Sequence, residues 1–241
     1  MNRNEASTTK NRATAQGSVP ASLTRISLGF VNAYLARTPL GFVLVDTGVP
    51  DSWDRLCGEL AACGCTKENL KVVVLTHGDM DHVGCARRLR KEWGVPIAAH
   101  RGDLAMMSTG EGPKRRGTSL PIRIGMKLRP FRKPDLEAAD SPYFTPDRFL
   151  EDGDSLLPYG WDARVVHGPG HTAGSIAILT ADGDLIIGDT ASNMTHPGPG
   201  MLAEDFDEYN RTLAALHLLP VRTVHPGHGG PFPFEKLPRR V

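Results

Sequence analysis

The sequence has no apolar run of the roughly 18 residues that a membrane-spanning helix needs. It also lacks an excess of charge of either sign, because 28 lysines and arginines stand against 27 aspartates and glutamates, for a net charge of +1. This balance excludes a strong attraction of the whole molecule for nucleic acid or for an anionic membrane. A charged partner would therefore have to meet a local patch.

The N-terminal segment, residues 1–22, is polar and lacks the apolar stretch of a signal peptide. We expect a disordered tail over residues 1–22 and a cytoplasmic protein. The 241 residues are enough to bury a substantial core, and the simplest organisation is one domain over residues 23–241.

Cysteine is scarce, with four residues in the chain, and none of them forms a C-x-x-C pair. This spacing argues against a structural zinc site built from thiolates, so we expect reduced, structural thiols. A G-x-S-x-G motif is missing as well. The sequence therefore gives no sign of a serine nucleophile.

Hydrophobic periodicity predicts alternating strands and helices. Residues 71–76 form a continuously apolar run, which is typical of a strand buried on both faces. Asp182-Gly183 between two apolar runs predicts a hairpin. The expected strands cover 27–38, 41–48, 71–76, 95–100, 163–171, 175–190 and 222–230, and the expected helices cover 51–64, 83–94 and 204–219. This order predicts an α/β fold, an αββα sandwich of two mixed β-sheets with helices on the outer faces.

Histidine and aspartate gather in four short motifs, each in a turn after a predicted strand. The motifs are THGDMDH (76–82), GPGHTAGS (168–175), IIGDT (186–190) and HPGHGG (225–230). Imidazole nitrogens and carboxylate oxygens are ligands of zinc, iron and manganese. A polar turn that caps the next helix through Asp81 is the alternative for the first motif. The ends of sheet strands are also where open α/β folds bind their ligands.

Taken in order, these motifs and VDTG at 45–48 resemble the metallo-β-lactamase superfamily, including its glyoxalase II-like hydrolases. The resemblance covers about residues 30–230 and implies the αββα fold with up to two metal ions at a sheet edge. It implies His77, Asp79 and His171 as ligands of one ion, Asp81, His82 and His228 as ligands of the other, and Asp189 as a bridge. It also implies a catalytic role for Asp81 in orienting water.

The chain departs from the superfamily at Asp79, since it reads H-x-D-x-D-H where most members read H-x-H-x-D-H. A carboxylate in place of an imidazole makes the site harder and more negative. We expect two divalent ions per chain, with zinc as the first candidate and iron or manganese open because of Asp79.

The implied reaction is attack by a metal-bound hydroxide on an ester, lactone, thioester or phosphodiester of a small molecule. An iron-dependent oxygenase or other redox enzyme of the same fold is the main alternative. A nuclease and a true β-lactamase are weaker alternatives. Near-zero net charge speaks against the nuclease, and the missing signal peptide speaks against the β-lactamase.

The irregular stretch from about 102 to 147 reads as an insertion, with a basic segment at 113–133. Its apolar and basic residues alternate, which predicts an extended segment with one basic face. We interpret it as a lid over an anionic substrate or an arm of a homodimer, and a solvated edge strand is the alternative. The candidate substrate contacts are Arg123, Lys127, Arg129 and, after the GDT turn, His196.

Overall fold

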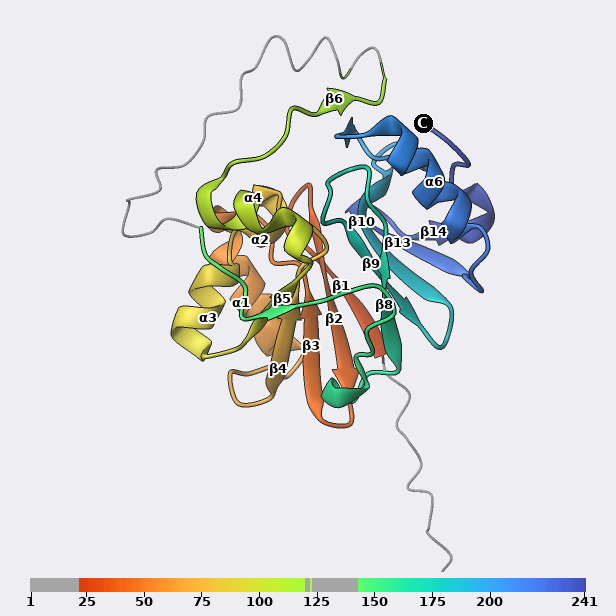
Figure 1. The fold of residues 1–241 in the computed structure, drawn as a ribbon. Helices are drawn as coiled ribbons and strands as arrows, with labels where there is room; N and C mark the ends of the chain where they lie inside the picture. Colours follow the sequence, from red (N-terminus) through yellow and green to blue (C-terminus); the bar gives the residue numbers. More distant parts are fainter. Residues whose placement is uncertain (1–21, 120–121, 123–142) are drawn as a thin grey trace, which may run out of the picture.

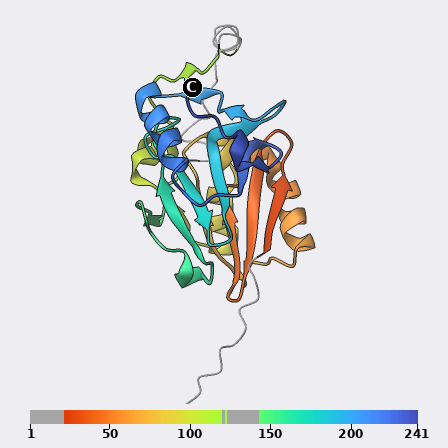
Figure 2. The same ribbon diagram turned by 90° about the vertical axis from the view of Figure 1, so that its right-hand side faces the viewer.

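The computed structural model describes residues 22–119, 122 and 143–241. Two mixed β-sheets pack face to face, and helices cover their outer faces (Figures 1 and 2). This architecture confirms the predicted αββα sandwich.

The first sheet has the strand order β1-β2-β3-β4-β5-β7. Its strands β1 to β3 pair antiparallel, and the pairs from β3 to β7 are parallel. The bounds are β1 (Ser22–Ser27), β2 (Asn32–Thr38), β3 (Gly41–Val45), β4 (Leu70–Val74), β5 (Ile97–Ala99) and β7 (Arg148–Phe149).

The second sheet has the order β14-β13-β10-β9-β8, and β11 pairs with β10. The bounds are β8 (Ala163–His167), β9 (Ile176–Thr180), β10 (Asp184–Asn193), β11 (Gly198–Pro199), β13 (Thr223–Gly229) and β14 (Phe232–Pro233). A separate two-stranded pair consists of β6 (Arg116–Gly117) and β12 (Leu202–Ala203). The hairpin predicted at Asp182-Gly183 joins β9 to β10, with Gly183 at φ 85°.

The helices lie outside the two sheets (Figure 1). Helices α1 and α3 cover the first sheet, and α6 covers the second (Figure 1). Their bounds are α1 (Trp53–Ala62), α2 (Met80–Val83), α3 (Ala86–Trp93), α4 (Leu104–Thr109) and α6 (Phe206–Leu216), with 3-10 turns at Pro50–Ser52, Arg101–Asp103, Leu157–Tyr159 and Phe234–Lys236.

Strand β4 is buried on both faces, as its apolar run predicts. Val72 and Val74 pack into the layer between the sheets, together with Ile178 of the second sheet. Val73 and Leu75 face the other way, toward the helices. Burial of apolar surface on both sides stabilises this strand, so the loop after it starts from a fixed point.

The helix predicted over 83–94 begins three residues later, as α3, because Gly84 and Cys85 separate it from the short α2 that ends at Val83. The backbone N–H of Gly84 donates to Gly48 O at 2.8 Å, and that of Cys85 donates to Thr47 Oγ1 at 3.2 Å. A Cβ at Gly84 would lie 2.4 Å from Pro50 N. Close contact with the loop after β3 therefore interrupts the helix.

Strand β1 was not predicted, although it pairs with β2 over its whole length. Its residues are mostly exposed or half-buried, so the sequence shows no clear apolar alternation there. Ladder hydrogen bonds to β2 hold it instead.

Several expectations fall on residues outside the described ranges. They include the tail before Ser22, most of the basic segment, and the candidate substrate contacts Arg123, Lys127 and Arg129. Within the described residues, no helix has the length and apolarity that a membrane crossing requires.

The four thiols differ in accessibility, which gives a chemical test of the fold. Cys65 and Cys85 are each 1% exposed, and burial raises the pKa of both thiols to about 12. At pH 8 only about one in ten thousand such thiols is ionised.

We expect iodoacetamide to alkylate Cys57 and Cys63 in the native protein and to spare Cys65 and Cys85, as read by peptide mass spectrometry. In denaturant all four should react. Equal native rates for Cys57 and Cys85 would contradict the packing.

Candidate metal centre

Four histidines and three aspartates converge where strands of both sheets end. They come from the loop after β4 (His77, Asp79), from α2 (Asp81, His82), from the loop between β8 and β9 (His171), from β10 (Asp189) and from β13 (His228). They form two groups, each able to hold a metal ion: His77, Asp79, His171 and Asp189 in one, and Asp81, His82 and His228 in the other. The sequence placed all seven of these residues at a metal centre.

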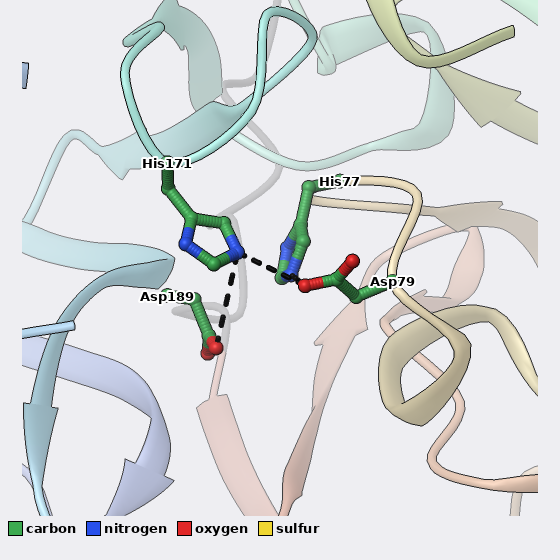
Figure 3. Close-up of side chains that lie close together, drawn as sticks. All are labelled: His77, Asp79, His171 and Asp189. Carbon is green, nitrogen blue, oxygen red and sulfur yellow. Dashed lines mark hydrogen bonds and ion pairs between the residues drawn. The ribbon is translucent and has the colours of Figure 1, made fainter. Parts of the chain in front are cut away.

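In the first group the side chains point toward one another (Figure 3). Asp79 Oδ2 lies 3.1 Å from His171 Nε2 and 3.4 Å from His77 Nε2. The Nε2 atom of His171 also lies 4.0 Å from Asp189 Oδ2.

The second group is connected to the first through Asp189. Its two carboxylate oxygens lie 3.2 Å from His82 Nε2 and 3.2 Å from His228 Nε2. Asp81 Oδ2 lies 3.3 Å from His228 Nε2 on the other side. Asp189 therefore stands between the two groups, where a bridging ligand would stand.

All four imidazole rings are oriented by a partner at Nδ1. These partners are Thr76 Oγ1 for His77 at 2.9 Å, Asp46 Oδ2 for His82 at 2.8 Å, Leu202 O for His171 at 2.8 Å and Phe30 O for His228 at 2.8 Å. When Nδ1 donates its proton to such a partner, Nε2 keeps a lone pair that points into the centre. This is the tautomer that binds a metal ion through Nε2.

The donor atoms fit metal binding by a second observation. Among the described residues, four buried side-chain atoms have no hydrogen-bond partner, and all four face this centre: His77 Nε2, His82 Nε2, His228 Nε2 and Asp189 Oδ1. Lone pairs of imidazoles facing carboxylate oxygens repel unless a cation lies between them. A metal ion or a proton must supply that charge.

The pKa values of these side chains show how strongly the centre attracts cations. Burial by itself would lower the pKa of His228, but the carboxylates of Asp189 and Asp81 raise it to about 10. Burial would likewise lower the pKa of His82, and the charges of Asp189, Asp46 and Asp81 raise it well above its usual range. A metal ion binding here would release such protons, so its affinity increases with pH.

Asp46 supports the centre from behind His82, and it explains the VDTG motif. It follows β3 directly and has φ 60°, a conformation that aspartate tolerates better than most residues. Its Oδ2 accepts from His82 Nδ1 and Thr76 Oγ1, and its Oδ1 accepts from Thr76 N at 2.8 Å. Thr76 in turn contacts His77 Nδ1, so one carboxylate positions ligands of both groups.

Asp103 is a second supporting residue, and no motif in the sequence marks it. It is 1% exposed and lies at the start of α4. Its oxygens accept from Gly78 N, Gly174 N and Thr172 Oγ1, each at 2.7 Å. The carboxylate thereby joins the loop that carries His77 to the loop that carries His171.

Arg115 was also missed as a site residue, although it belongs to the basic segment that the sequence singled out. Its guanidinium binds both carboxylate oxygens of Asp79, and Nη1 lies 3.2 Å from His171 Nε2. Burial by itself would raise the pKa of Asp79, but its close contacts with His171, His77 and the Arg115 guanidinium hold it well below its usual range.

The other histidines lie apart from the seven. His196 is exposed, and its described hydrogen bond is with the neighbouring Thr195 at 3.1 Å. His100 and His167 stack on each other with their ring centroids 4.1 Å apart. His225 pairs with Asp184 at 2.9 Å.

Comparison with known proteins agrees with this geometry. The sequence model of the family described as "Metallo-beta-lactamase superfamily" matches residues 26–228. The chain belongs to the metallo-β-lactamase superfamily. Its relatives show that it is a metallo-hydrolase of this fold.

Two relatives and one structure illustrate the similarity. The "Probable metallo-hydrolase YflN" of Bacillus subtilis is 25% identical over 86% of this chain and 83% of its own length. The "Hydroxyacylglutathione hydrolase GloC" of Haemophilus influenzae is 30% identical over 67% of this chain and 69% of its own. A metallo-beta-lactamase family protein of Thermus thermophilus shares the fold with a TM-score of 0.66, at 23% identity over 88% of this chain and 74% of that one.

The role of Asp46 can be tested with Asp46→Asn. The amide replaces one acceptor oxygen by a donor, which then opposes either the Nδ1 proton of His82 or the N–H of Thr76. We expect a loss of 10- to 100-fold in zinc affinity, measured by competition with a chromophoric chelator. The matched control is Asp184→Asn, which changes the Asp184–His225 pair and should leave zinc affinity unaltered. Equal affinity in both variants would rule out the supporting role.

Proposed function

We propose that this metallo-hydrolase cleaves a small-molecule acyl thioester or a related ester, with zinc as its metal. The observation that carries the proposal is the convergence of unpartnered Nε2 atoms and a buried carboxylate on one centre. The seven converging side chains include no serine, threonine or cysteine, and all seven are candidate metal ligands, so we assign the role of nucleophile to water. Bound divalent ions would supply Lewis acidity and lower the pKa of that water to near neutrality.

Asp81 is the residue of this chain best placed to handle the proton of the attacking water. Its side chain is 27% exposed, against 13% for Asp79 and 8% for Asp189. Its Oδ2 lies 3.3 Å from His228 Nε2, so the partly exposed carboxylate also contacts a candidate ligand. An aspartate in this position can accept a hydrogen bond from water and orient it toward a carbonyl carbon.

The substrate class rests on the relatives. Hydroxyacylglutathione, named for the Haemophilus influenzae relative, is an acyl thioester. Lactones, other esters and phosphodiesters stay open, because the same centre would polarise their bonds too. The iron-dependent redox alternative rested on the extra negative charge of Asp79. In the structure this carboxylate forms an ion pair with Arg115, so its charge does not favour a harder ion while the pair persists.

The proposal is tested on the purified zinc-loaded protein with S-acyl glutathiones, an aryl ester, a lactone, a phosphodiester and a β-lactam. We expect the highest kcat/KM for a thioester, within the usual enzyme range of about 10⁴ to 10⁸ M⁻¹s⁻¹. The comparison of kcat/KM across the panel ranks the substrate classes by stabilisation of their transition states.

A second part of the test concerns Asp189→Ala. Loss of the carboxylate between both groups should lower the zinc content per chain and abolish hydrolysis, and Asp184→Ala serves as the control with normal values. Full zinc content in Asp189→Ala would show that the bridging position is assigned wrongly. Oxygen uptake by the iron-loaded protein without hydrolysis by the zinc form would contradict the hydrolase.

A further inference from the structure

The positively charged guanidinium of Arg115 lies against the first group of candidate ligands, where a metal ion would bind. Its guanidinium holds both oxygens of Asp79, and its Nη1 is 3.2 Å from His171 Nε2. His171 donates its Nδ1 proton to Leu202 O, so its Nε2 carries a lone pair and accepts a hydrogen bond from the guanidinium. Two of the donor atoms that would hold the first ion therefore already have a positively charged partner.

The backbone around Arg115 fixes this arrangement. The strand β6 starts at the next residue and pairs with β12, with Gly117 opposite Leu202. Thr118 adds hydrogen bonds from N to Met201 O at 2.9 Å and from Oγ1 to Gly200 O at 2.7 Å. Leu202 also orients His171. The same strand pair thus positions the arginine and the histidine it contacts, and the Arg115 side chain is only 18% exposed.

The two groups differ in which atoms lack partners. In the second group both histidine Nε2 atoms are unpartnered, whereas in the first group only His77 Nε2 is, because His171 Nε2 and both oxygens of Asp79 contact Arg115; the unpartnered Asp189 Oδ1 lies between the groups. The charges agree with this difference. Three carboxylates face the centre, Arg115 neutralises that of Asp79, and those of Asp81 and Asp189 match one divalent cation.

We propose that Arg115 is a built-in counter-ion at the His77–Asp79–His171 position, which makes the two metal positions unequal. The position formed by Asp81, His82 and His228, with Asp189, binds a divalent cation first and tightly. The position at Asp79 binds a second cation only when the guanidinium is displaced. The fork of an arginine suits this role because it pairs with both oxygens of a carboxylate and stays charged.

This inference rests on the metal positions of the proposed function, but its test uses no substrate. Metal-free protein is titrated with Zn²⁺ in competition with a chromophoric chelator, and bound zinc is counted by elemental analysis. For the unaltered chain we expect one tight equivalent and a second that is at least tenfold weaker. In Arg115→Ala the affinity for the second zinc ion should increase tenfold or more. In Arg115→Lys it should increase by less, since lysine keeps the positive charge but cannot pair with both carboxylate oxygens as arginine does.

The matched control is Lys114→Ala, which removes the same charge from an exposed neighbouring residue and should leave both affinities unchanged. Misfolding cannot imitate the expected result, because a gain in metal affinity requires an intact site. Two equally tight equivalents in the unaltered chain would overturn the proposal. An unchanged second affinity in both Arg115→Ala and Arg115→Gln would also overturn it.

Discussion

Repulsion between the imidazole Nε2 lone pairs and the carboxylate oxygens at the metal centre is the constraint on which the rest of the structure depends. The carboxylate oxygens of Asp189 lie 3.2 Å from the Nε2 atoms of His82 and His228. Both rings donate their Nδ1 protons on the opposite side, to Asp46 and to Phe30 O. Such an arrangement is unstable without a cation and would relax if the side chains were free to turn. The scaffold therefore has to hold each ring and each carboxylate in place.

That rigidity comes from two sources. Strands β4, β10 and β13 are buried between or within the sheets, so the segments that carry the ligands start from fixed backbone. The partners that orient the rings come from distant parts of the chain, such as Phe30 for His228 and Leu202 for His171. Asp46 and Asp103 then connect ligand loops to each other through buried hydrogen bonds. Ligand geometry is thus a property of the packed sandwich.

The electrostatic effect of Asp79 depends on its ion pair with Arg115. As an isolated substitution in the ligand motif, a carboxylate makes the first position more negative and suggests a harder metal ion. Paired with a guanidinium that is held by the β6–β12 strand pair, the same carboxylate is neutralised. The motif and the insertion that supplies the arginine therefore form one electrostatic unit, although 36 residues separate Asp79 from Arg115.

The sequence by itself determined the sandwich, the buried strand β4, the hairpin at Asp182-Gly183 and the set of side chains that converge. These features depend on local periodicity, on turn chemistry and on motifs of a few residues. Tertiary structure alone decided the break in the helix at Gly84, the addition of β1 and the positions of Asp103 and Arg115. Each of these depends on a hydrogen bond or ion pair between segments far apart in the chain, and such contacts leave no periodic signal in the sequence.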